Sequence, residues 1–552
     1  MKRERYIELM DKALSAYTVE HMHQYLEEVR TGGLKEHGFA RLASNLGILI
    51  AHGYRRELVP LFIEMMDLCC ESFPKVKAAN DFTVKEVIFC LMELERCDVI
   101  SKEKIDGWKA LLATIQVENT YDVYAKEPTD KVYNWACFTA VSEWMRQYIG
   151  LAQTEDFVSV QVASQLQWLD DNGMYRDPNE PMVYDSVTRG LFAVLLHFGY
   201  KGKYYKEMDD CLRNAGLLSL KMQSVSGELA FGGRSNQFLH NEAHLALLAE
   251  FEANRYAKEG NMELAGQFKA SVEEAITLMG SWLEKERITH IKNRYPTGGQ
   301  YGCEGYGYFN KYMITTASFI YVAYLIADDS IPVIARDEQP YVFSTSEHFH
   351  KTFMRAGDYF LEFDTAADPH YDASGLGRVH KKGANSMVCM NMPCTATPTY
   401  TIDMENVPNA SFAAGYRDEA GLHFALTRDT KYERTTAFAT PVGAKVAFIC
   451  HFEDGKTVRS SYEVDKNGVE ILVTGQEDLA FMLPAYFFNG ESETEIIAEE
   501  NALTVKYEGS VCKFTTNGTI TDLQQIACSR NGHHKLFAAE GKNELRIKIE
   551  IL

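Results

Sequence analysis

The sequence lacks the features that most readily place a protein at a membrane or on nucleic acid. No uninterrupted apolar run reaches the length of a membrane-spanning helix. There is no basic tract, and the net charge of −21 repels nucleic acid and anionic membranes. The N-terminal segment MKRERYIELMDKAL is charged and amphipathic, without the apolar core and small-residue cleavage site of a secretory signal. We therefore expect a cytoplasmic protein that binds neither nucleic acid nor membranes.

The sequence also lacks paired cysteines and cofactor motifs. Its 12 cysteines are scattered, and no CxxC pair has a matching partner. This pattern predicts neither a disulfide framework nor a zinc site, so reduced, buried thiols are expected. The glycine-rich stretch DASGLGRVHKKG is no phosphate loop, because the order strand, GxxxxGK[ST], helix is missing. We predict no cofactor and no metal; if a divalent ion binds, the candidate ligands are Asp364, Asp368 and Asp372.

What the chain has in abundance is helical periodicity, which fills residues 1–330. Apolar residues recur there at spacings of three and four and predict about twelve or thirteen helices. Helices that follow a polar or aromatic loop start near His37, Phe82, Tyr133, Tyr184, Asn236 and Tyr306, and each step holds two helices. A helical hairpin cannot bury both of its faces alone, so we predict six hairpins closed into an (α/α)6 toroid. An open superhelical array is the alternative.

Beyond a short linker with prolines at residues 331–340, the pattern changes to strand-like alternation. Residues 340–552 are rich in β-branched and aromatic residues, with strands expected, for example, at 341–344, 359–362, 445–451 and 544–551. Asn-Gly pairs, suited to tight hairpins, begin at Asn467, Asn517 and Asn531. We predict an antiparallel β-sandwich, and hence a toroid domain at 1–330 followed by a sandwich domain at 340–552.

Three loops that lead into predicted inner helices carry an unusual density of functional groups. We call them the first (residues 170–189), second (226–244) and third (295–313) polar loop. Each is rich in glycine, aromatic and polar residues, which a loop that only connects helices does not need. Ring closure brings the loops to the same end of the toroid. We therefore predict a sugar-binding cleft there, with Trp135 as a further stacking surface.

In the second polar loop, the run GGRSNQFLHNE gathers a cation, amides, an imidazole and a carboxylate. Arg234 is suited to gripping a carboxylate with two nitrogens. Asn236 and His240 are four residues apart and share a helix face, and Asn241 and Glu242 follow directly. An N-cap, or a satisfied polar group between helices, is the structural alternative for these residues.

In the third polar loop, glycines alternate with Tyr301, Glu304, Tyr306 and Tyr308. A phenol stacks on a sugar, donates a proton to a leaving oxygen, or acts as a base, and Glu304 is a candidate acid. Asp185 of the first polar loop is a further candidate acid, with an ordinary ion pair to a neighbouring arginine as the alternative.

A fourth cluster lies early in the strand-rich region, where GRVHKKG gathers basic side chains in an acidic protein. We expect Arg378 and His380 to belong to an arm that reaches over the toroid mouth and binds an anionic group. A solvated turn is the alternative.

The segments GGRSNQFLHNEAH, RYPTGGQYGCEGYGYFNKYM and DASGLGRVHKKG resemble the heparinase II/III-like group of carbohydrate-active enzymes, and the resemblance covers nearly the whole chain. It implies a helical toroid followed by a β-sandwich and a uronate-containing oligosaccharide as substrate. The group includes polysaccharide lyases and, on similar toroids, β-glucuronidases. By this resemblance, the lyase roles fall on Asn236 or Asn241, on His240, and on Tyr306 or one of Tyr295, Tyr301 and Tyr308.

Two enzyme chemistries therefore remain open. A hydrolase that releases uronic acid needs two carboxyl groups, and Asp185, Glu242 and Glu304 provide one at each polar loop. We favour this β-glucuronidase-like interpretation, because an intracellular enzyme is expected to trim imported oligosaccharides. The first alternative is a lyase that uses His and Tyr in β-elimination, and the second is a non-catalytic carbohydrate-binding protein. Outer helices with apolar faces leave a homo-oligomer open.

Overall fold

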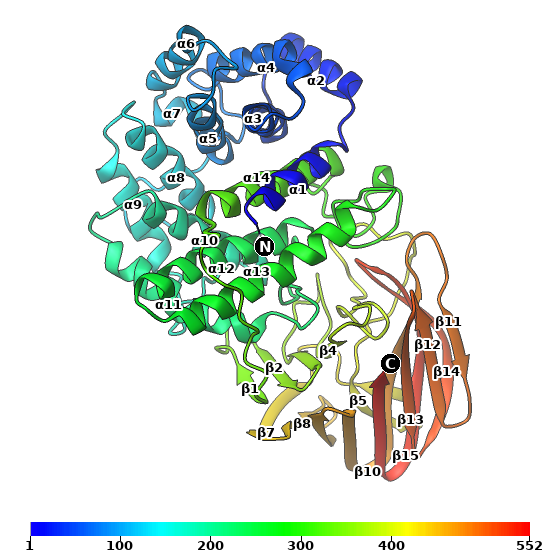
Figure 1. Cartoon of the computed structure of the whole chain (residues 1–552). Helices are drawn as coiled ribbons and strands as arrows, with labels where there is room; N and C mark the ends of the chain where they lie inside the picture. The colour runs from blue at the N-terminus through cyan, green and yellow to red at the C-terminus, as the bar shows by residue number, and fades with distance from the viewer. Residues whose placement is uncertain (1) are drawn as a thin grey trace.

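The computed structural model describes residues 2–552. Helices (blue to green) form one half of the molecule and strands (yellow-green to red) the other, as Figure 1 shows. The last helix, α14, ends at Ile326, and the first strand, β1, begins at Tyr341. The predicted order of a helical region followed by antiparallel strands is thus confirmed. Within the described residues, no helix combines the length and the apolar character needed to cross a membrane.

Six helices form a closed inner ring. Each packs against the next, and the last returns to the first. In ring order these helices are α3 (His37–Ala51), α5 (Val84–Leu94), α8 (Trp135–Tyr148), α10 (Met182–His197), α12 (His240–Lys258) and α14 (Phe309–Ile326). The ring confirms the closed toroid over the open array, and five of its helices begin within three residues of the predicted starts.

The outer helices cover this ring and keep one face in water. Their polar residues face outward and their apolar residues face the inner helices, as the pattern of alternating buried and exposed positions in α11 illustrates. They are α1 (Glu4–Leu14), α2 (Val19–Gly32), α4 (Val59–Ser72), α6 (Lys102–Ala113), α9 (Glu155–Leu166), α11 (Tyr205–Met222) and α13 (Met262–Leu283). The sequence does not predict the one-turn helix α7 (Val117–Thr120), because four residues carry no periodicity.

The strands form two antiparallel sheets that pack on each other. The small sheet has the order β1 (Tyr341–Ser344), β2 (Lys351–Ala356), β3 (Tyr359–Asp364), β4 (Gly375–Lys381). The large sheet has the order β11-β12-β13-β15-β10-β9-β8-β7, with β14 on β15 and the pair β5–β6 on β10. Strands β1 and β2 contact β7, β8 and β9, so the predicted sandwich is confirmed.

In chain order, the large sheet begins at Ala414, within the first half of the strand-rich region, and its last strand ends at Ile551. Its strands are β5 (Ala414–Asp418), β6 (Gly421–Phe424), β7 (Lys431–Thr440), β8 (Gly443–His451), β9 (Thr457–Asp465), β10 (Gly468–Phe488), β11 (Glu495–Ala498), β12 (Ala502–Tyr507), β13 (Ser510–Thr516), β14 (Thr519–Ser529) and β15 (Gly532–Ile551).

The tight hairpin between β14 and β15 connects the large sheet to the toroid. Ser529 pairs with Gly532, so Arg530 and Asn531 form the turn, at one of the predicted Asn-Gly pairs. The Asn531 side chain donates to Gln237 Oε1 of the second polar loop (3.1 Å). The toroid and the sheets are therefore joined at the end of the ring that carries the polar loops.

Candidate active site

A cavity of about 320 Å³ opens at this end of the toroid. It is lined from the inner helices and from all three polar loops. Of the residues predicted for a site, Trp135, Arg234, His240 and Tyr306 line it together. These four side chains come from positions as far apart as 135 and 306, so their meeting depends on closure of the ring. The remaining polar lining consists of His37, Arg41, Asn134, Tyr184, His244, Lys311, Tyr312 and Thr315.

Ser235 connects the three polar loops at the wall of the cavity. Its hydroxyl lies 3.1 Å from the Tyr184 hydroxyl and 2.9 Å from the Tyr306 hydroxyl. Its backbone N–H donates to Glu304 Oε1 (2.7 Å). The residue has a φ of 57°, in the left-handed region that favours glycine, and it follows Gly232 and Gly233, which also have positive φ. The second polar loop is thus bent into an unusual conformation, and this conformation places its side chains at the cavity.

Gly233 is required for this bend on steric grounds. A Cβ atom at this position would lie 2.6 Å from Cα of Pro181, closer than real Cβ contacts occur. The backbone N–H of Gly233 donates to Asp372 Oδ2 (2.8 Å), at the start of the strand-rich region.

Arg234 is fixed in the cavity wall by contacts on two sides. Its guanidinium forms an ion pair with Asp177 and donates to the carbonyl oxygen of Pro178 (2.6 Å). It also lies over the ring of Tyr184, 4.4 Å from the centroid. Asp177 in turn accepts from Asn134 Nδ2 (2.9 Å). The cation is therefore held in one orientation while its own residue lines the cavity.

The charged side chains that line the cavity are cationic. Arg41, Arg234 and Lys311 line it, and within the described residues no aspartate or glutamate does. Each of these cations pairs with a carboxylate that is not part of the lining: Arg234 with Asp177, Arg41 Nε with Glu86 (3.2 Å) and Lys311 Nζ with Glu36 (3.7 Å). A protein of net charge −21 thus presents a local cationic surface, which favours an anionic ligand.

Burial, with a smaller contribution from neighbouring cations, lowers the pKa of the buried histidines of the cavity and keeps them uncharged. Burial lowers the pKa of His240 to about 3, and Arg41, His290 and Lys292 contribute to this lowering. Burial and neighbouring cationic groups also lower the pKa of His37 and of His244. His240 Nδ1 has no hydrogen-bond partner. That nitrogen is buried, but the side chain lines the cavity, and a neutral imidazole is suited to accepting a proton.

The tyrosine phenols of the cavity, in contrast, keep their protons, because their pKa values are raised. Burial, Tyr184 and Glu304 raise the pKa of Tyr306, so its hydroxyl keeps its proton at neutral pH. Tyr306 nevertheless remains 37% exposed, and Tyr312 lies between it and His240, with ring centroids 5.9 and 5.4 Å away. The cavity therefore holds a potential proton donor and a potential proton acceptor that both neighbour one tyrosine ring.

The three predicted acids lie outside this lining. Asp185 forms a two-point ion pair with Arg189 (2.9 and 2.5 Å) and accepts from Tyr175 N. Glu242 is fully buried and pairs with Lys292 (2.8 Å). Glu304 is likewise paired, with Arg530. Each of the three carboxylates is therefore engaged by a cation and is not free to contact a substrate.

Glu304 has the closest relation to the cavity. It pairs with Arg530 of the β14–β15 turn (2.6 and 3.0 Å). Since it also accepts from Ser235 N, it supports the second polar loop from behind.

Arg378 and His380 do not form the expected arm over the toroid mouth. Both lie in β4 and are buried. Arg378 pairs with Glu362 (3.0 Å) and donates to the carbonyl of Leu229, and His380 contacts Ser224 Oγ (2.6 Å). These residues join the small sheet to the toroid, because the segment forms a strand of the sheet rather than a free turn.

Four further predicted residues also lie outside the cavity lining. Tyr301 is stacked on Tyr295 (3.6 Å between centroids) and donates to the carbonyl of Ser529. Tyr308 is the residue before α14 and lies against Lys311. Asn236 and Asn241 are buried beside the second polar loop, each with one unpaired amide atom.

The three aspartates considered for a divalent ion have separate partners. Asp364 pairs with Lys351 (3.0 Å) and with His350, Asp368 binds His370 and Asn179, and Asp372 accepts from the second polar loop. They do not converge on one point.

Several lining residues are not predicted by the sequence. Arg41, His37 and His244 lie on inner helices among apolar residues, and their direction toward the cavity follows only from the closed ring. Tyr184 and Tyr312 belong to the first and third polar loops. The high aromatic content of these loops is the sequence feature that could have indicated them.

Neither a protein-family model nor a curated protein matches the chain. Solved structures with a similar arrangement include a mutant of the heparan sulfate lyase from Pedobacter heparinus (9% identity, TM-score 0.43, 93% of this chain and 76% of the other). Another is the chondroitin AC lyase of Streptomyces coelicolor A3 in complex with chondroitin sulphate (9%, TM-score 0.49, 99% and 79%). A third is a Paenibacillus xanthan lyase (9%, TM-score 0.47, 93% and 53%). These three structures are what the chain is similar to in the arrangement of its backbone, each with a TM-score below 0.5.

Proposed function

We propose that this protein is a lyase that cleaves uronate-containing oligosaccharides by β-elimination. The observation that carries the proposal is the composition of the cavity wall: cations, a neutral histidine and protonated tyrosines, without a carboxylate among the described lining residues. Hydrolysis of a glycoside needs two carboxyl groups at the bond. β-Elimination needs a cation for the uronate carboxylate, a base and an acid.

The carboxylate of the uronate is the group that the cationic wall would bind. Arg234 is fixed by Asp177 and Tyr184 and offers a planar donor surface. Pairing the carboxylate with a cation acidifies the proton at C5, because the charge that develops on proton removal spreads onto the carboxylate oxygens.

His240 is the proposed base. Its imidazole is neutral at neutral pH and lines the cavity. A pKa of about 3 makes it a weak base in the free protein, but a bound uronate carboxylate opposes the effect of Arg41 and raises that pKa. Removal of the C5 proton then forms the C4–C5 double bond as the bond from C4 to the leaving oxygen breaks.

Tyr306 is the proposed acid that protonates this leaving oxygen. Its phenol is protonated, partly exposed to the cavity and positioned by Ser235. The proton taken by His240 and the proton given by Tyr306 balance, and no water is consumed. Trp135, which packs against Phe82 at 4.6 Å between centroids, offers an aromatic face for a neighbouring sugar.

The test is the nature of the product from a panel of uronate oligosaccharides. A lyase yields a 4,5-unsaturated uronate with a strong ultraviolet absorbance, whereas a hydrolase yields saturated uronic acid. Binding without turnover on the whole panel would indicate the carbohydrate-binding alternative. The names of the similar structures agree with the proposal, but the composition of the cavity carries it.

A further inference from the structure

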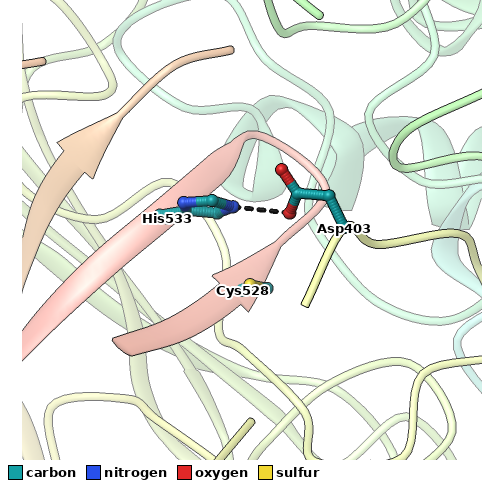
Figure 2. A group of neighbouring side chains, drawn as sticks. All are labelled: Asp403, Cys528 and His533. Carbon is teal, nitrogen blue, oxygen red and sulfur yellow. Dashed lines mark hydrogen bonds and ion pairs between the residues drawn. The ribbon is translucent and has the colours of Figure 1, made fainter. Parts of the chain in front are cut away.

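A second cluster of chemically active side chains lies on the β14–β15 hairpin, away from the cavity lining. Cys528 and His533 are direct partners across the two strands, so their side chains lie on the same face of the sheet. Asp403 reaches this face from the segment that precedes β5 (Figure 2). One sulfur, one nitrogen and one oxygen, each able to bind a metal, lie within 4.8 Å of one another.

This set of donors fits one metal better than others. Zinc binds thiolate, imidazole and carboxylate together in tetrahedral sites, whereas calcium and magnesium prefer oxygen alone. Tetrahedral zinc with bonds of about 2.0 to 2.3 Å holds neighbouring ligand atoms roughly 3.5 Å apart. Side-chain movements of about an ångström would bring the three atoms from their present separations to these distances.

The surroundings of the cluster also suit an ion. Asp403 is exposed and provides a route of entry, while Cys528 is buried and His533 nearly so. His533 Nε2 lies 2.7 Å from Asp403 Oδ1, so two of the three donors already face each other. The centroids of the Tyr295 and Tyr301 rings each lie 6.1 Å from that of the His533 ring, and the two rings shield this side from water.

We propose that Asp403, Cys528 and His533 bind one Zn²⁺ ion, with a water molecule as the fourth ligand. On binding, the Cys528 thiol releases its proton to solvent, and the contact between Asp403 and His533 is replaced by two bonds to the metal. The spacing of the ligands, with more than a hundred residues between Asp403 and Cys528, explains why no zinc motif is visible in the sequence.

The position of the ion assigns it a structural role. The segment that carries Asp403 is bonded to the third polar loop, because Gly302 N donates to Thr401 O (2.8 Å) and Thr401 N donates to Cys303 O (3.0 Å). The hairpin that carries the other two ligands has Arg530 in its turn, and Arg530 binds Glu304 of that loop. Zinc would therefore fasten to each other the two elements that support the third polar loop.

The experiment is a calorimetric titration of the chelator-treated full chain with zinc sulfate. The wild-type protein is expected to bind one zinc per chain. Asp403→Asn and Cys528→Ser are expected to weaken this binding by roughly 100-fold or more. Cys394→Ser is the matched control, since Cys394 is a buried cysteine that contacts the neighbouring histidine, His534 (3.5 Å), and it should bind zinc like the wild type.

Cobalt provides a readout that identifies the ligand. Wild-type protein loaded with Co²⁺ should show the near-ultraviolet charge-transfer band of a thiolate ligand, and Cys528→Ser should lose it. Asp403 is on the surface, so its substitution tests the site even if the cysteine variant fails to fold. Unchanged zinc binding in Asp403→Asn, or loss of binding in Cys394→Ser instead, would overturn the proposal. Neither readout depends on the lyase activity.

Discussion

The hydroxyl of Tyr306 lies 2.9 Å from the hydroxyl of Ser235, and this contact joins the third polar loop to the second. Ser235 adopts its left-handed backbone conformation at the same point and receives support from Glu304. The proposed acid is therefore positioned by a residue that is itself fully buried. Chemistry at Tyr306 and the shape of the second polar loop should respond together to mutation.

Tyr306→Phe removes only the phenolic oxygen and should lower kcat by about 100-fold or more, because the leaving oxygen loses its proton donor. KM should change much less. Steady-state kinetics on a uronate oligosaccharide measure both. Tyr308→Phe is the matched control, since Tyr308 lies two residues away and outside the cavity lining. Equal effects of the two substitutions would remove Tyr306 from its proposed role.

Arg234→Ala should act mainly on substrate binding. Loss of the guanidinium removes a cation from the carboxylate subsite, so KM should rise by about tenfold or more, which corresponds to about 1.4 kcal/mol. The substitution also leaves Asp177 without its ion pair, so the melting temperature must be measured alongside. A folded variant with wild-type KM would contradict the assignment.

The part of the candidate site that lies in the polar loops is predictable from the sequence. The glycines, aromatics and polar groups of the second and third polar loops indicate Arg234, His240 and Tyr306, and the repeat of helical hairpins predicts that a closed ring brings them together. All three line one cavity. Arg41 is not predictable in this way, because a single arginine in an apolar helix looks the same whether it faces a cavity or a buried partner.

The roles of the carboxylates depend on partners that the sequence does not reveal. Glu242 pairs with Lys292, fifty residues later, and Glu304 pairs with Arg530 of a distant hairpin. Each of these pairs forms only after distant parts of the chain have assembled. In the sequence, a carboxylate near a glycine-rich loop therefore has the features of a candidate acid, although in the structure it neutralises a buried cation.

Glu242→Gln separates a structural carboxylate from a catalytic one. Lys292 keeps Glu228 as a partner (3.2 Å), so the variant should lose roughly 1.5 to 3 kcal/mol of folding free energy, the contribution of one hydrogen bond between charged groups. The folded fraction should retain kcat within a few fold of wild type. Chemical denaturation and kinetics at low temperature test the two parts. A stable but inactive variant would restore Glu242 as a catalytic acid.

The buried histidines predict a loss of stability in acid. Burial lowers the pKa of His380 to about 3 in the folded state, with Arg378 as the next cause, while the unfolded chain binds the proton near the ordinary value of about 6.5. The unfolded state thus binds more protons below this value. The contribution of neutral His380 is fully present above a pH of about 6.5 and is lost as the pH falls toward 3, by up to about 1.4 kcal/mol per pH unit.

His380→Gln should therefore flatten the dependence of the unfolding free energy on pH between about 6.5 and 4.5, above the range where most carboxylates titrate. Denaturant titrations at several pH values measure this slope. His23→Gln, at an exposed position of α2, is the control and should leave the slope unchanged. The same slope in all three proteins would contradict a neutral, buried His380.

The most direct test of β-elimination is to carry out the reaction in water enriched in oxygen-18 (heavy oxygen) and to measure the masses of the products by mass spectrometry. Elimination consumes no water, so cleavage itself should add no heavy oxygen beyond the slow exchange of reducing-end hydroxyls, and one fragment should be lighter by a water molecule than the saturated sugar. Incorporation of one heavy oxygen atom per bond cleaved would mean hydrolysis and would contradict the roles proposed for His240 and Tyr306.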